Sequence, residues 1–251
     1  MSIPNSFNSM GTLHGGVKPG QVVVGNSIDG TKTILFDAAS ATNGSYMFYN
    51  CTNLTSWNID MPNLTNASYM FANCSNLRSF RGALPSLKNA TYMFQNVQNC
   101  DLRTVAFPKL EIANGTFWTS SCLLDDTETF ATVTNAQQMF YKSSTLPPSA
   151  ITLENATNVI QAFDLLTVVV RNMPNLNLSK LTQAPGAFAR AAAFNAATVH
   201  AIASTLPNMS GATAWNITLG VDKTLQDDAA VQADLQLIRD KNYNLTVGYN
   251  A

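Results

Sequence analysis

The chain has 251 residues, of which 46% are hydrophobic and only 12% are charged, and its formal net charge is -1. This hydrophobic share is enough for a buried core, whereas the charged share is roughly half of the usual ~25%. With no basic stripe, the composition argues against binding to nucleic acid or to anionic lipid. The polarity comes instead from Asn, Ser and Thr, which suits a protein that works outside a cytoplasm.

The first forty residues differ from the rest, and we expect residues 1–40 to form an N-terminal β-rich cap or attachment segment. Two β-like runs, 21–24 and 31–36, flank Asp29 and Gly30, a dipeptide typical of a hairpin turn. This segment either closes the end of the fold or joins the chain to a larger assembly.

The start of the chain, MSIPNSFNSM, has neither the basic residues nor the apolar run of ~7–15 residues that a secretion signal needs. The longest apolar stretch, 165–170, is too short to cross a bilayer. We therefore expect no membrane insertion. The location that we expect is a virion or an extracellular surface, reached without a visible signal peptide.

A sequence repeat with a 23-residue period dominates residues 41–193. One column of phenylalanines keeps this spacing without a break and continues after one slightly longer step: Phe48, Phe71, Phe94, Phe117, Phe140, Phe163 and then Phe188. Other columns keep the same register: Met47, Met70, Met93 and Met139 before the Phe; Asn43, Asn66, Asn89, Asn135 and Asn158 five residues before it; Leu54, Leu77, Cys100, Leu123, Leu146 and Val169 six after it; and Leu64, Leu87, Leu110 and Val133 sixteen after it.

A unit as short as this one cannot close a core alone, but stacked units can, because each apolar column becomes a continuous ridge. The pattern predicts an α/β fold: a leucine-rich-repeat-like solenoid with a parallel β-sheet on one face, short helical turns on the other and distinct terminal caps. In this interpretation segments such as 66–73 are helical, with the Asn column as N-caps, and segments such as 55–59 are strands. Asn50, Asn73 and Asn96 lie where a left-handed helix exit suits asparagine.

Three segments, SYMFYNCTNLTSW, SYMFANCSNLRSF and TYMFQNVQNC, resemble BspA-like leucine-rich repeats. The resemblance rests on a Met-Phe pair followed by Cys and then Leu at intervals of three, as in Phe48-Cys51-Leu54 and Phe71-Cys74-Leu77; the third segment has Val97 and Cys100 at these two positions. The fourth and sixth units depart from it, with Thr116 and Ala162 before the Phe. Over residues 41–176 this resemblance implies a surface protein or adhesin that binds protein or glycan, and a phage-encoded member is one form of it.

Residues 194–251 resemble the closing module of repeat proteins from gut bacteria and their phages. The residues themselves predict a helix over 198–206, a strand over 215–221, a helix over 229–241 and a strand over 245–247. We expect this α/β module to cap the open end of the repeats.

Side chains suited to catalysis are sparse, so we expect no enzyme activity, no cofactor and no resident metal. His14 and His200 have no evident Cys or carboxylate partner nearby in the sequence. The acidic cluster Asp125, Asp126 and Glu128 lacks the loop pattern of a calcium site and is interpreted as a solvated face, with metal binding as the alternative. Cys51 and Cys74 share one column; we favour reduced, buried thiols over a disulfide, and the spacing of the four cysteines excludes a paired zinc motif.

Binding is expected on the strand face, where outward side chains of successive units line up. A constant period places there Ser56, Asn58, Ser79, Arg81, Leu102, Thr104, Asp125 and Thr127. A second candidate is the aromatic column of Tyr46, Tyr69 and Tyr92, whose rings could stack on a sugar or a protein edge; the alternative is that they cover the flank of the repeats.

The function that we expect is a non-catalytic binding or adhesion module, a phage virion appendage that contacts host-surface glycan or protein. Its N-terminal segment would hold other virion or surface proteins, and the chain could form an oligomer. The alternatives are a bacterial cell-surface adhesin and an intracellular protein-binding scaffold.

Overall fold

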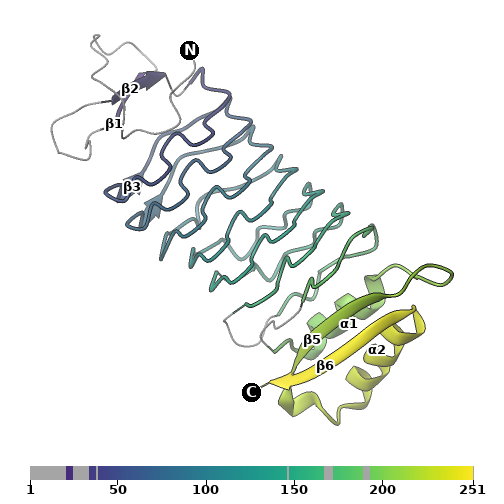
Figure 1. The fold of residues 1–251 in the computed structure, drawn as a ribbon. Helices are drawn as coiled ribbons and strands as arrows, with labels where there is room; N and C mark the ends of the chain where they lie inside the picture. Colours follow the sequence, from purple (N-terminus) through teal and green to yellow (C-terminus); the bar gives the residue numbers. More distant parts are fainter. Residues whose placement is uncertain are drawn as a thin grey trace.

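A computed structural model describes residues 21–24, 34–37, 39–145, 147–166, 172–188 and 193–250. The repeats within 39–188 wind as stacked coils, which gives this part a solenoid-like repeat fold (Figure 1). Parallel bridges join equivalent residues of neighbouring coils, for example Asn43 to Asn66 and Asn66 to Asn89. In the described residues the α-helices, α1 and α2, lie after the repeats.

The predicted phenylalanine column is confirmed as the centre of the core. Each ring is at most 2% exposed and stacks on the next, with centroids 5.3 Å apart for Phe48 and Phe71 and 5.4 Å apart for Phe163 and Phe188. The methionines of the neighbouring column are also buried. At position 116 a threonine takes the methionine's place, and its hydroxyl donates to the Ala90 carbonyl at 3.0 Å, so this polar group is buried but satisfied.

Our prediction of short helical turns in the repeats is wrong. The N–H groups of Tyr46, Phe48 and Asn50 donate to carbonyls of the next coil at 2.9 Å, whereas the residues between them donate three residues back within their own coil. Tyr46 and Asn50 have φ values of 59° and 61°. Two left-handed residues four apart cannot belong to an α-helix, so this side of each coil is a run of tight turns held to the next coil by hydrogen bonds.

The asparagine column does not supply helix N-caps either. Asn66 accepts hydrogen bonds from the backbone N–H and the hydroxyl of Ser68, two residues on, at 3.0 and 2.7 Å. This is the local turn that asparagine favours, and it leaves the Asn66 backbone free to bridge Asn43 and Asn89. The left-handed backbone expected at Asn50, Asn73 and Asn96 is confirmed, although no helix ends there.

The predicted strands exist but are short. β3 (Ser56–Trp57) pairs in parallel with β4 (Ser79–Phe80), and single bridges continue this ladder to Asp101 and Leu123. Turns that begin at prolines such as Pro62 follow the strands, as the sequence indicates.

At the N-terminal side, β1 (Gln21–Val24) pairs antiparallel with β2 (Ile34–Asp37), in agreement with two β-like runs. The turn residues Asp29 and Gly30 lie outside the described residues, as do His14, Leu146 and Val169. The predicted division of the chain into an N-terminal segment, repeats and a C-terminal module, with boundaries after residues 40 and 193, stays a prediction.

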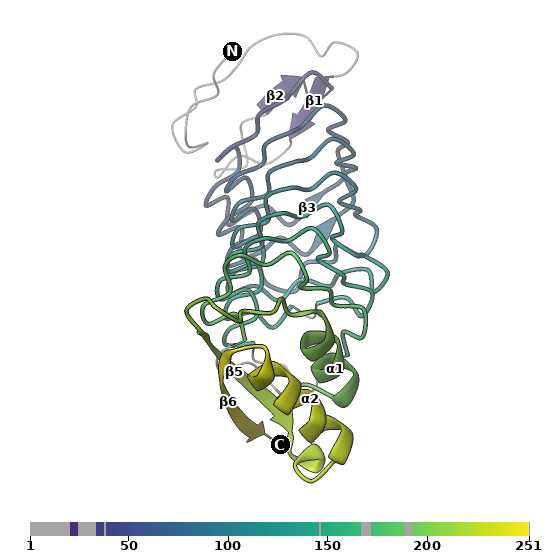
Figure 2. The same ribbon diagram turned by 90° about the vertical axis from the view of Figure 1, so that its right-hand side faces the viewer.

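The C-terminal part follows the predicted order of elements: α1 (Ala196–Thr205), β5 (Trp215–Asp222), the short 3-10 helix η2 (Lys223–Leu225), α2 (Ala229–Asp240) and β6 (Tyr243–Asn250). β5 and β6 are parallel neighbours, and α2 is the crossover between them. Phe194 packs edge-on against Phe188 and bridges Val221 of β5, so it connects this unit to the last coil. Figure 2 shows the unit at the end of the stacked coils.

Candidate functional site

On the strand face, one outward column runs through Ser56, Ser79, Asp101 and Leu123. The first step of this column follows the repeat period, but the next two steps are each one residue shorter. The constant period used for the prediction therefore places the later coils out of register. Because neighbouring strand residues point to opposite faces, this slip reverses two assignments. Leu102, expected outside, is fully buried, and Leu123, expected inside, is 48% exposed; Cys122 is buried instead.

Asp101 and the two arginines beside it form the charged centre of this face. Asp101 accepts hydrogen bonds from Arg81 Nη2 at 2.7 Å and from Arg103 Nε at 3.0 Å. The side chains of Arg81 and Arg103 remain 43% and 62% exposed, whereas that of Asp101 is 17% exposed. Hydrogen bonds from Arg103 and then from Arg81 hold the pKa of Asp101 well below its usual range. The cluster has a net charge of +1 and keeps guanidinium donors available to a ligand.

The other predicted strand-face residues are distributed less evenly. Ser56 and Asn58 are exposed in the first coil, and Thr104 is exposed beside Arg81, which donates to its hydroxyl at 3.3 Å. Asp125 instead accepts from the N–H and the hydroxyl of Thr127 at 2.8 and 2.6 Å. The structure therefore brings Ser79, Arg81 and Thr104 together with Asp101, and it leaves Asp125 and Thr127 as a local turn.

The acidic cluster is divided among separate structural bonds. Asp126 accepts from the N–H of Ser149 at 2.7 Å, and Glu128 accepts from the N–H groups of Phe107 and Phe130 at 3.1 and 3.2 Å. These carboxylates fasten one coil to the next. No group of three or more potential metal ligands occurs in the described residues.

The tyrosine column forms a surface stripe on the turn side. Tyr46 stacks on Tyr69 with centroids 4.7 Å apart and planes 8° apart, and Tyr69 stacks on Tyr92 at 5.0 Å. The two ring faces of Tyr69 are thus covered by its neighbours, and the residue as a whole is half-buried. Burial raises the pKa of Tyr69 and Tyr92. This geometry argues against a sugar stacked on the middle ring and favours the interpretation that these rings cover the flank.

Further aromatic residues, which the sequence reasoning missed, extend this stripe. Tyr92 contacts Trp118 at 5.3 Å, and Trp118 contacts Tyr141 at 4.9 Å. Both follow a core Phe directly, at the same place in their units as Tyr49, and this common position was the signal available in the sequence. In the fourth coil, Gly115 occupies the position that tyrosine has in the earlier coils. It has a φ of 57°, and the Tyr92 ring packs over it.

All four cysteines are free thiols in the structure. The Cys74 thiol donates to the Phe48 carbonyl at 3.0 Å. Burial raises the pKa of the Cys51 thiol to about 11 and that of Cys100 to about 12. Thiols with such pKa values stay protonated near neutral pH and are therefore poor nucleophiles.

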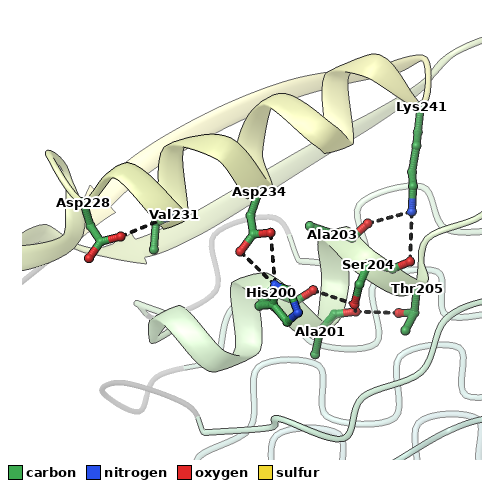
Figure 3. Close-up of polar contacts among 9 residues, drawn as sticks. All are labelled: His200, Ala201, Ala203, Ser204, Thr205, Asp228, Val231, Asp234 and Lys241. Atoms are coloured by element: carbon green, nitrogen blue, oxygen red, sulfur yellow. Dashed lines mark hydrogen bonds and ion pairs between the residues drawn. The ribbon is translucent and has the colours of Figure 1, made fainter.

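His200 has a carboxylate partner that the sequence did not reveal. Its Nδ1 lies 3.1 Å from Asp234 Oδ1, between α1 and α2 (Figure 3). The nearby Ser204 hydroxyl donates to the His200 backbone carbonyl at 2.8 Å and not to the imidazole, so no nucleophile–base pair forms. Lys241 donates to the carbonyls of Ala203, Ser204 and Leu206, which satisfies the C-terminal end of α1. These contacts fasten the two helices to each other.

In the part of the chain that the structure describes, no helix is both long and apolar enough to cross a membrane. Residues 26–124 match the family model for a BspA type leucine rich repeat region, in six copies, and residues 116–215 match that for a Mycoplasma protein of unknown function, DUF285. No curated protein and no solved structure matches the chain. Together the two matches support a BspA-like leucine-rich-repeat family for this chain, which is consistent with surface adhesion or protein binding.

Proposed function

We propose that the chain is a non-catalytic binding module of a phage virion appendage, which contacts a protein or glycan on the host surface through its strand face. The match to BspA type repeats supports binding at a surface. The low charge and the Asn-, Ser- and Thr-rich composition support work outside the cell, because neutral hydrogen bonds are little affected by salt.

One observation carries the choice of the strand face. Asp101 accepts hydrogen bonds from both Arg81 and Arg103. The backbone bridge between Asp101 and Leu123 places the exposed Leu123 side chain beside them on the next coil. Exposed guanidinium donors beside an apolar side chain are the composition typical of protein-binding sites. The aromatic stripe is the weaker candidate, because its rings already stack on one another.

The two ends of the chain have different roles in this proposal. The N-terminal segment attaches the chain to other virion or surface proteins. The C-terminal unit caps the repeats. The contact of Phe194 with Phe188 and its bridge to β5 support this role, because an uncapped last repeat would expose apolar surface.

The non-catalytic assignment is supported by how the described reactive groups are used. The thiols are buried or, at Cys51, partly buried, and burial raises their pKa values. The carboxylates of the acidic cluster accept backbone hydrogen bonds, and His200 joins two helices. Each of these groups already has a structural role.

The test is binding of the fluorescently labelled chain to intact bacterial cells, measured by flow cytometry over a range of concentrations. Wild-type chain should bind, and the double variant Arg81→Ala with Arg103→Ala should bind at least about tenfold more weakly, which corresponds to ~1.4 kcal/mol. The control is Lys109→Ala, which removes an exposed positive charge from a turn away from the strand face.

Equal binding by the double variant and by wild type would overturn the strand-face site. Binding only to virion proteins in a parallel pull-down would assign the chain a structural role in the particle. Binding to neither, with capture of cytosolic proteins alone, would favour the intracellular scaffold.

A further inference from the structure

Within the described residues, strand β6 has one edge without a paired strand. All eight of its residues pair with β5, from Trp215–Tyr243 to Asp222–Asn250. No strand or bridge of the described residues pairs with its other side. β5 is different, because the bridge from Phe194 covers part of its second edge. Along the outer edge of β6, roughly half of the backbone N–H and C=O groups therefore face away from any partner strand.

This edge lacks the features that usually prevent pairing with another chain. The strand reads YNLTVGYN, with no lysine, no other charged residue and no proline. Its register with β5 is continuous, so no bulge twists the edge away. Natural proteins protect most exposed edges with one of these devices, because an open, flat strand is a template for a further strand.

The apolar side chains of β6 are less buried than those of β5. On β5, Ile217, Leu219 and Val221 are at most 1% exposed. Their register partners on β6, Leu245, Val247 and Tyr249, pack against the core but are only partly buried. A strand added outside β6 would cover this row and satisfy the free backbone groups at once.

We infer that β6 pairs antiparallel with β6 of a second copy, which gives a four-stranded sheet across a two-fold axis. The strand is its own complement in this arrangement. Pairing centred on Thr246 places Leu245 opposite the partner's Val247, so that these apolar side chains meet. It also places Asn244 opposite the partner's Gly248 and Thr246 opposite the partner's Thr246. No like charges meet, because the strand carries none. An isologous contact of this kind closes after two copies.

The position of β6 allows such a contact without disturbing the repeats. Figures 1 and 2 place β6 in the unit at the end of the molecule away from the first coil. Two copies joined there extend away from each other, and both strand faces of the repeats stay accessible. The contact between copies does not depend on the ligand proposed above. Each dimer would carry two strand faces in place of one.

The test is sedimentation velocity of the full chain between about 5 and 200 µM, since a contact of one strand pair is small and we expect a dissociation constant of roughly 1–100 µM. The mass should rise from 27.1 kDa toward twice that value as concentration increases. Thr246→Lys, at an exposed position, places two like charges opposite each other. This substitution should raise the dissociation constant of the dimer at least tenfold. The control, Ala233→Lys, adds the same charge on an exposed position of α2 and should leave it unchanged.

A second variant tests the geometry without depending on loss of an interaction. Thr246→Cys should form a disulfide-linked dimer under mild oxidation, because directly opposed strand residues lie within disulfide range. A wild-type chain that stays monomeric at the highest concentration would overturn the inference. So would a dimer that Thr246→Lys leaves intact, or one that Thr246→Cys fails to link.

Discussion

Replacement of Phe71 by alanine is the perturbation whose effect the structure defines best. The Phe71 ring is fully buried, stacks on Phe48 at 5.3 Å and on Phe94 at 6.0 Å, and meets Trp57 and Phe80 edge-on at 5.3 Å. A buried Phe→Ala change costs about 3–5 kcal/mol, and aromatic pairs contribute ~0.5–1.5 kcal/mol each beyond burial. With four ring contacts removed, we expect a loss near the upper end, about 4–5 kcal/mol.

Urea denaturation gives this loss as a change in the free energy of unfolding, followed by the fluorescence of the three tryptophans, of which Trp57 contacts Phe71 directly. Thr104→Ala is the matched control on the exposed side of the same repeats, and it should change stability by no more than about 0.5 kcal/mol. A loss below about 1 kcal/mol for Phe71→Ala would refute the stacked aromatic core.

Three further predictions concern the turn side, the charged centre and the thiols. Gly115→Ala should destabilise by at least about 2 kcal/mol in thermal or urea unfolding, because φ is 57° there and a Cβ would lie 2.2 Å from the Tyr92 ring; an unchanged midpoint would contradict the placement of this ring. Hydrogen bonds from two arginines lower the pKa of Asp101, so its contribution is present above the unfolded pKa of ~3.9 and is lost as the pH falls toward the folded value. Asp101→Asn should therefore cost about 1 kcal/mol at pH 7 and progressively less below pH 4, and a cost that grows in acid would show the opposite sign of linkage. In native protein at pH 8, mass spectrometry should find the partly buried Cys51 alkylated by iodoacetamide well before the fully buried Cys100, with full labelling of both in urea; equal native rates would contradict this difference in burial.

The aromatic grid could be predicted from the sequence because burial repeats with the coil. A side chain that faces the core in one coil faces it in the next, so Phe48 and Phe163 share an environment although they are far apart in the chain. The elements of the C-terminal part were also predictable, since each of them carries its own apolar periodicity.

The turn side could not be predicted from one unit. Its N–H groups pair with the next coil, and no pattern within a single repeat distinguishes such turns from a short helix. The left-handed backbone at Tyr46 is the deciding feature, and tyrosine gives no signal of it.

The register slip, in contrast, left a trace in the sequence. Trp57 and Phe80 begin a buried column on the inner side of the strands, and Leu102 continues it after a step that is one residue shorter. An aligned apolar column with a shortened step was enough to place Asp101 outside. The assumption of a fixed period concealed the outward position of Asp101. It therefore also concealed that Asp101 is the ion-pair partner of Arg81 and Arg103.

The alignment of outward side chains on the strand face is tested most directly by disulfide formation between engineered cysteine pairs. Ser79→Cys with Asp101→Cys should oxidise to an intramolecular disulfide that mass spectrometry detects, because bridged neighbours in a parallel ladder lie ~4.8 Å apart. Ser79→Cys with Leu102→Cys, the pair that a constant period predicts, should not link, since Leu102 points into the core. Preferential linkage of the second pair would contradict the register, and with it the binding surface built on Asp101.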